Sequence, residues 1–263
     1  MTLLCARDII VIMTYLIVPD IHQEINQLNE ILIKYNHIQK KISLGDWYDT
    51  HGDNDTPNDV AEVARMHADF INNPNHICLM GNHDINYAYT GIRDLSCSGH
   101  GVWKQLYINS AMKTETWDKV RLFYWMIINK KNWLLSHAGV HPYFFKGMEN
   151  VADKRKHLNF LSHKAKFNLK TYQKVDEILQ PGESRGGNHP TGGLTWLDFR
   201  EFKPIPEINQ IVGHTHNPGF GKDKIIIFNS ENYCIDGSSS VTFNYMGHVA
   251  ILEDDGTCHV EEI

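Results

Sequence analysis

Short apolar runs alternate with helix-like segments in the first third of the chain. The runs Thr14–Val18, Lys41–Leu44 and Asn75–Met80 have the length of buried strands. One helix is predicted to begin near Gln23 and a second is capped by Thr56, each with an apolar residue every three or four positions. Three strand–helix units in succession predict a parallel sheet with a site at the carboxyl ends of its strands.

The rest of the chain predicts a second sheet. Lys119–Ile128 and Trp133–Leu135 form an expected hairpin around residues 129–132, and Ile208–Val212 is another buried strand. The C-terminal part alternates in short strands, expected to be antiparallel and to form a second sheet packed on the first: Lys224–Phe228, Tyr233–Ile235, Val241–Tyr245, Val249–Leu252 and Thr257–Val260.

The fold class is therefore α/β, with residues 13–263 as a single domain that has neither repeat nor linker. Residues 149–180 are charged, with apolar residues at helical spacing, and predict a helical insertion that we expect to form a lid. Residues 86–118 show no clear period, and covering the site or filling space explain them equally well. Met13 would serve as a start codon, so residues 1–12 are a possible leader.

Composition excludes several classes of protein. The 263 residues are 42% hydrophobic with a net charge of −6, which gives no basic footprint for bulk nucleic-acid binding. The apolar run near the N-terminus is too short to span a bilayer, so no membrane attachment is expected. The five scattered cysteines argue against a disulfide framework and favour a reducing compartment, the cytoplasm. The 16 histidines raise the expectation of a metal site.

Polar residues with metal-binding side chains follow the predicted strands. Gly45 lets the chain turn sharply, so Asp46 is expected in the crevice at the sheet edge. Taken alone, an ordinary acidic turn would explain Asp46 better. Similar groups recur after the other strands, however, as Asp20 and His22, Asn82 and His83, His137, and His214 and His216. His67 lies on an apolar helix face and is predicted to be a core histidine.

These five blocks, in this order, resemble the calcineurin-like metallophosphoesterase superfamily, which includes the phosphoprotein phosphatases. The resemblance runs from about Thr14 to Gly237. It implies a two-sheet αββα sandwich with a two-metal centre between the sheets. One metal would be held by Asp20, His22, Asp46 and His216, and the other by Asp46, Asn82, His137 and His214. His83 would protonate the leaving group, and Asp49 would orient it.

The residue types agree with this chemistry. Two adjacent divalent ions can generate a hydroxide nucleophile and clamp the attacking and leaving oxygens of a phosphate. Oxygen and imidazole ligands without a thiolate favour manganese, with iron, zinc or cobalt as alternatives.

One departure from the family concerns phosphate binding. In the phosphoprotein phosphatases and dinucleoside tetraphosphatases the second block continues Asp-Arg-Gly, whereas Asp49 is followed here by Thr50. Arg185 and His51 are the candidate substitutes. Trp47 and Tyr48 flank Asp46 and could stack on a nucleobase, although burial in the core is the alternative for at least one of them.

The leading hypothesis is a two-metal phosphoesterase acting on a phosphorylated small molecule or nucleotide. Without an arginine beside Asp49, the sequence favours phosphodiester or phosphoanhydride substrates, since a dianionic monoester needs that contact more. A phosphomonoesterase, including a protein phosphatase, is the alternative. An inactive scaffold that binds a protein partner is the hypothesis of another class, but it predicts lost ligands, and every ligand position is filled.

Overall fold

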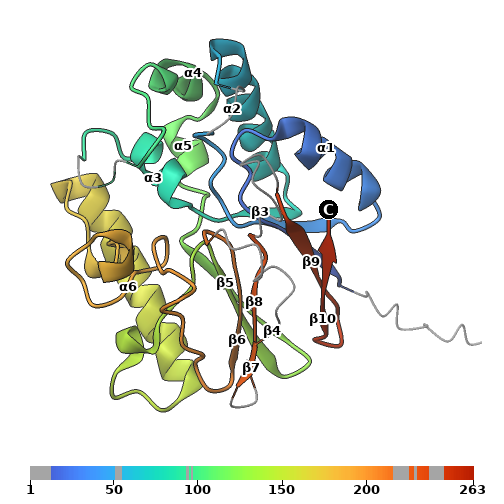
Figure 1. Ribbon diagram of the computed structural model, residues 1–263, viewed down its shortest axis with the longest axis vertical. Coiled ribbons are helices and arrows are strands. Elements are labelled where there is room, and N and C mark those ends of the chain that lie inside the picture. The colour runs from blue at the N-terminus through green and yellow to red at the C-terminus, as the bar shows by residue number, and fades with distance from the viewer. Residues whose placement is uncertain are drawn as a thin grey trace, which may run out of the picture.

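The computed structural model describes residues 13–50, 55–92, 95, 97–215, 225–227, 230–236 and 246–263. Two five-stranded sheets form its centre, with the strand orders β10-β9-β1-β2-β3 and β4-β5-β6-β8-β7. Helices cover both outer sides, as Figure 1 shows, with α1 and α2 against the first sheet and α6 beside the second. The predicted α/β fold with two packed sheets is therefore present.

The first sheet contains the three predicted strand–helix units. β1 (Tyr15–Val18), β2 (Lys40–Ser43) and β3 (His76–Cys78) pair in parallel. The helices that connect or follow them are α1 (Ile25–Lys34), α2 (Pro57–Asn72) and α3 (Asn82–Ala88). α2 begins as its sequence predicts: Thr56 and Asp59 form a capping box, and Pro57 occupies the first turn, where its missing N–H leaves no bond unmade.

The second sheet is built around a hairpin. β4 (Phe123–Ile128) and β5 (Lys131–Ser136) are antiparallel, and β5 pairs in parallel with β6 (Ile208–Val212). The hairpin loop is shorter than predicted. Asn129 and Lys130 both have positive φ, which matches the twist of a two-residue turn, so β5 starts at Lys131.

The C-terminal strands do not form a sheet of their own, and this part of the prediction was wrong. β7 (Ile225–Ile227) and β8 (Ser230–Cys234) extend the second sheet, and β8 pairs with β6 in parallel. β9 (His248–Leu252) and β10 (Cys258–Glu262) extend the first sheet beside β1. Alternation predicts that a segment is a strand but not which neighbour it pairs with. Val241–Tyr245 lies outside the described residues.

Alternating side chains of β1 serve two cores. Ile17 lies in the core between the sheets, together with Ile42 of β2 and Trp133 of β5. Leu16 and Val18 point the other way, into the core that contains the apolar faces of the surrounding helices. Burial on both faces accounts for the almost continuous apolar sequence of the strand.

The segments outside the sheets differ from one another. The region 86–118 contains α4 (Lys104–Ala111) and α5 (Thr114–Trp117), and single-turn helices lie at Pro142–Phe145, Glu177–Leu179 and Glu183–Arg185. α6 (Val151–Tyr172) occupies the predicted insertion. None of the residues of α6 lines the site cavity described below, so the structure gives this helix no contact that would make it a lid.

Within the described residues, no helix combines the length and apolar character needed to cross a membrane. Cys78, Cys97, Cys234 and Cys258, which include every cysteine of the described part of the chain, are free thiols.

Candidate metal centre

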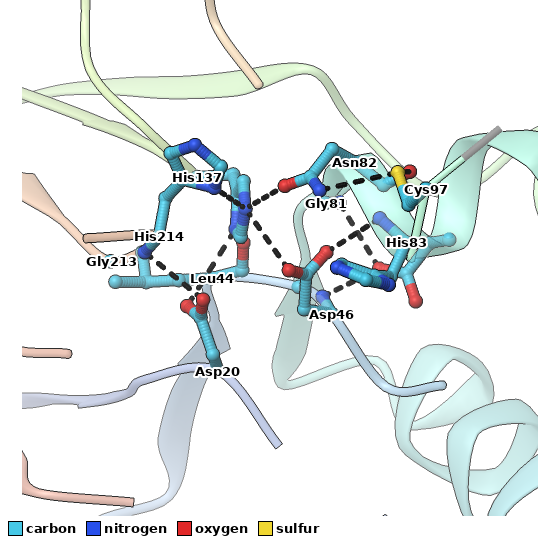
Figure 2. Close-up of polar contacts among 12 residues, drawn as sticks. Asp20, Leu44, Asp46, Gly81, Asn82, His83, Cys97, His137, Gly213 and His214 are labelled. Carbon is cyan, nitrogen blue, oxygen red and sulfur yellow. Dashed lines mark hydrogen bonds and ion pairs between the residues drawn. The ribbon is translucent and has the colours of Figure 1, made fainter. Parts of the chain in front are cut away.

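The polar residues predicted from the strand ends come together at one edge between the two sheets. Asp20 follows β1, Asp46 follows β2 and Asn82 follows β3, while His137 and His214 follow the parallel strands β5 and β6. Figure 2 shows the side chains of these residues pointing toward one another. All five are at most 7% exposed, so bulk water does not compensate their polar groups.

The turn after β2 brings two backbones into close contact. Gly45 has φ of 110°, and a Cβ at Gly45 would lie 2.5 Å from the backbone nitrogen of Gly81. A Cβ at Gly81 would lie 2.0 Å from Oδ1 of Asp46. Both positions therefore require glycine, because any side chain would separate the turns that follow β2 and β3.

Several site residues adopt a left-handed backbone conformation, which is costly for residues other than glycine. Asp46 has φ of 49°, and His22, Asp49 and His214 also have positive φ. Strain of this kind persists only where surrounding contacts impose it, and it is common in functional sites.

Asp84 is the residue whose hydrogen bonds hold this strained turn, a role that the sequence pattern did not predict. Its Oδ2 accepts hydrogen bonds from the backbone N–H groups of Asp46 at 2.8 Å and Gly81 at 3.0 Å. Its Oδ1 accepts one from the N–H of Trp47 at 2.8 Å. The sequence does contain a signal for Asp84, since an acidic residue three positions after Gly81 matches a capping box at the start of α3.

Asp20, His22 and Asp46 form the first cluster of potential metal ligands, with one ligand atom from each lying within 4.8 Å of the others. Nδ1 of His22 lies 2.7 Å from the carbonyl oxygen of Asp49, which fixes the proton on Nδ1. The lone pair is thereby left on Nε2, which lies 3.7 Å from Oδ2 of Asp46.

Asp46, His137 and His214 form the second cluster. Nδ1 of His137 lies 3.1 Å from the carbonyl oxygen of Leu44 and donates its proton there. Nε2 of His137 then faces three further atoms: Oδ1 of Asn82 at 2.8 Å, Oδ2 of Asp46 at 3.3 Å and Nδ1 of His214 at 3.2 Å. Asp46 thus belongs to both clusters.

The atoms in the two clusters fit divalent cations. Oxygen and nitrogen atoms that can bind a cation converge, and backbone carbonyls orient two of the imidazoles, as is usual for metal-binding histidines. Nε2 of His214 and Oδ1 of Asp20 are buried and make no hydrogen bond with the described part of the chain. A cation would satisfy both atoms.

The buried charges shift one another's pKa values. Burial would raise the pKa of Asp46, but the imidazoles of His137, His83 and His22 outweigh burial and lower it. Burial would lower the pKa of His137, but Asp46 and Asp20 raise it to about 10. Burial and the neighbouring His137 lower the pKa of His214. Burial and Asp236 raise the pKa of Asp20. The carboxylates of the site therefore attract positive charge strongly.

His83 and Asp49 form a pair beside the clusters. Nδ1 of His83 lies 3.1 Å from Oδ2 of Asp49, and the backbone N–H of His83 donates to Oδ1 of Asp46 at 2.9 Å. Burial would lower the pKa of His83, but Asp46 and Asp49 reverse that effect and raise it. His83 is therefore held close to Asp46 with its protonated form favoured.

A cavity of about 140 Å³ opens onto the clusters, lined by His22, Asp46, Asn82, His83, Cys97, Ser98, Arg185, Trp196 and His214. Arg185, predicted from the sequence as a phosphate contact, is among these residues. Its Nε lies 2.9 Å from Oδ2 of the buried Asp198, and its Nη2 donates to Oγ1 of Thr215 at 3.5 Å. Cys97, Ser98 and Trp196 could not be predicted as lining residues, because they come from irregular segments without a recognisable motif.

The structure contradicts the predicted stacking role of Trp47 and Tyr48. Both rings are fully buried. Trp47 stacks on His67, with ring centroids 4.4 Å apart and planes 8° from parallel, and the Tyr48 hydroxyl lies 3.1 Å from Nδ1 of His67. Neither residue lines the cavity, and His67 is the core histidine that the sequence predicted. His51 and His216 lie outside the described residues.

Comparisons with known proteins agree with this geometry. The model of the calcineurin-like phosphoesterase family matches residues 13–218. Because this match covers most of the chain, the chain belongs to that family. It is a metal-dependent phosphoester hydrolase. No curated protein matches the chain.

Among solved structures, the cold-active protein-tyrosine phosphatase of a psychrophilic Shewanella species is 15% identical, with a TM-score of 0.54. The alignment covers 95% of this chain and 80% of that one. A protein serine/threonine phosphatase from Saccharomyces cerevisiae is 13% identical, with a TM-score of 0.49 over 95% and 79% of the two chains. A putative diadenosine tetraphosphatase is 15% identical, with a TM-score of 0.43 over 96% and 95%. The similarity to the Shewanella enzyme shows a shared fold.

The contacts of Asp84 lead to a stability prediction. In Asp84→Asn one carboxylate oxygen becomes an amide nitrogen, which cannot accept a hydrogen bond, so at least one buried N–H loses its acceptor. The free energy of unfolding of the metal-free protein should fall by about 1–3 kcal/mol, measured by urea denaturation. Asp69→Asn, on the exposed side of α2, is the control. Equal stabilities of the two variants would show that Asp84 does not stabilise the turns.

Proposed function

We propose that the site binds two divalent ions that share Asp46. Asp20, His22, Asp46 and His216 would bind one ion, and Asp46, Asn82, His137 and His214 the other. The observation that carries this proposal is the presence of Asp46 in both clusters of potential ligands. The place of His216 rests on the sequence alone.

Manganese is the proposed metal, and iron, zinc and cobalt are the alternatives, because the two clusters offer carboxylate and imidazole groups without a thiolate. When bound, such a pair of ions supplies Lewis-acid charge and lowers the pKa of water at the site. The cytoplasm is the proposed compartment, because it keeps thiols such as those of this chain reduced.

His83 is proposed to give a proton to the departing oxygen of the substrate. It lines the cavity, and the two neighbouring carboxylates favour its protonated form. With Nδ1 directed to Asp49, Nε2 is the nitrogen available to the substrate. Asp49 would keep the ring in this orientation and stabilise its positive charge.

Arg185 is proposed to bind the non-bridging oxygens of the phosphoryl group. Asp198 lies 2.9 Å from its Nε, which restricts the guanidinium, and Arg185 lines the cavity. An arginine at this position weakens the argument against monoesters that rested on Thr50. We therefore propose a phosphate monoester of a small molecule as the substrate.

A nucleotide-type phosphodiester or phosphoanhydride is the second candidate. Trp47 and Tyr48 do not support it, but Trp196 lines the same cavity as Arg185. Its ring lies edge-on to His214, with centroids 5.6 Å apart, and an indole at this place could stack on a base.

The metal proposal predicts that Asp46→Asn disables both positions at once. Wild-type protein should contain two divalent ions per chain by elemental analysis, whereas Asp46→Asn should contain fewer, with kcat lower by roughly 10³-fold. Asp69→Asn should keep both ions and full activity. One ion or none in active wild-type protein would contradict the proposal, as would near-normal turnover by Asp46→Asn.

The role of His83 predicts a dependence on the leaving group. His83→Ala should lower kcat by roughly 10²–10⁴-fold on an alkyl phosphate, whose departing oxygen needs a proton. On an activated aryl phosphate, which leaves without one, the loss should be far smaller. Steady-state kinetics with the two substrates provide the measurement. Equal losses would mean that His83 binds or orients the substrate instead.

The role of Arg185 predicts a difference between monoesters and diesters with the same leaving group. Arg185→Ala should lower kcat/KM for the monoester by about 10–100-fold, as expected for charged hydrogen bonds, and should lower it less for the diester. Arg200 also pairs with Asp198, at 2.8 Å, but does not line the cavity, so Arg200→Ala is the matched control. A wild-type preference for the diester that Arg185→Ala leaves unchanged would favour the second candidate.

A further inference from the structure

The carboxylate of Asp49 lies at the centre of a buried polar group that extends beyond His83. Tyr87 and Lys104 also contact it, and both are 1% exposed, while Asp49 itself is 2% exposed. Tyr87 comes from α3, one helical turn after His83, and Lys104 begins α4. Neither residue lines the cavity next to the metal clusters.

The two oxygens of Asp49 have different partners. Oδ1 accepts a hydrogen bond from the hydroxyl of Tyr87 at 2.6 Å and one from Nζ of Lys104 at 3.1 Å. Oδ2 lies 3.1 Å from Nδ1 of His83. Since Tyr87 and Lys104 both contact Oδ1, they fix the plane of the carboxylate and leave Oδ2 free to pair with the imidazole of His83.

The direction of the Tyr87 hydroxyl is determined by its other neighbour. The backbone N–H of Gly101 donates to the Tyr87 oxygen at 3.2 Å. A hydroxyl has one proton, and here the N–H already occupies an acceptor position on its oxygen. The proton is therefore donated to Asp49.

Each N–H group of the Lys104 ammonium has a hydrogen-bond acceptor. Besides Asp49, its ammonium contacts Oδ1 of Asp55 at 2.6 Å and the carbonyl oxygen of Gly99 at 3.0 Å. These are three acceptors for three N–H donors. The lysine cannot turn toward the cavity without losing these three contacts. It therefore places its positive charge beside Asp49 without lining the cavity.

We propose that Tyr87 and Lys104 are positioning residues for the reaction, which hold Asp49 so that it keeps His83 in its productive orientation. Lys104 provides a positive charge to Asp49 from a position 55 residues further along the chain. This inference rests on the proposed role of His83.

The test uses Tyr87→Phe and Lys104→Met, with the ratio of kcat on an alkyl phosphate to kcat on an activated aryl phosphate as the readout. Tyr87→Phe keeps the ring and removes only the hydroxyl, and it should lower this ratio by about ten-fold, in line with a hydrogen bond to a charged group. Lys104→Met should lower the ratio at least as much. Elemental analysis should show an unchanged metal content in Tyr87→Phe.

The chain offers a matched control for each variant. Tyr35 is another buried tyrosine whose hydroxyl donates to a carboxylate, that of Glu261 at 2.5 Å, so Tyr35→Phe removes the same kind of bond elsewhere. Lys154 is another buried lysine, which donates to the carbonyl oxygen of Glu149 at 2.8 Å. Lys154→Met is therefore the control for Lys104→Met. Thermal unfolding identifies any loss of stability, and both control variants should keep the wild-type ratio.

The outcomes separate this inference from the role of His83. If His83→Ala lowers the ratio but Tyr87→Phe leaves it unchanged or lowers both rates equally, the inference is wrong and the role of His83 stands. If His83→Ala itself leaves the ratio unchanged, the proposed role of His83 as proton donor is wrong.

The double variant gives a second test. Tyr87→Phe added to His83→Ala should lower the ratio by less than about two-fold, because residues that act through one another are not additive. A full further ten-fold loss would also overturn the inference. If Lys104→Met does not fold, Tyr87→Phe alone decides.

Discussion

One buried carboxylate joins the two turns on which the site depends. Asp84 accepts the N–H groups of Asp46, Trp47 and Gly81, so the turns after β2 and β3 behave as one rigid unit. These N–H groups point away from the strand ladders and would otherwise be buried without partners, which is costly. Their shared acceptor stabilises the left-handed conformation of Asp46. The direction of its side chain, between the two histidine clusters, follows from that conformation.

Much of the fold and most of the metal clusters could be predicted from the sequence, for a geometric reason. Parallel strands end at the same edge, so polar residues placed directly after β1, β2 and β3 must lie close together whatever the details of the loops. Asp20, Asp46 and Asn82 were found in this way. The membership of Asp46 in both metal sets, in contrast, came from the resemblance to the metallophosphoesterases.

Other features depend on contacts that a local pattern does not contain. Trp47 directly follows Asp46, yet its ring is turned into the core by the left-handed turn and stacks on His67 of α2. The sign of φ at Asp46 cannot be read from its neighbours. Lys104 lies in a segment without helical periodicity, and its burial requires acceptors from three separate places in the chain. The partners of the C-terminal strands are likewise set by long-range packing.

The pairing of β1 with β9 has a consequence for how the protein is made. Tyr15 lies opposite Leu252, so β1 receives one of its two neighbours only after the distant strand β9 has been synthesised. Until then, β1 and β2 can pair, but the other edge of β1 remains open and apolar. Exposed edges of this kind can pair with other chains, and such long-range pairing is slow. During synthesis β1 therefore keeps one unpaired edge until β9 is made, whereas the finished fold pairs β1 on both sides.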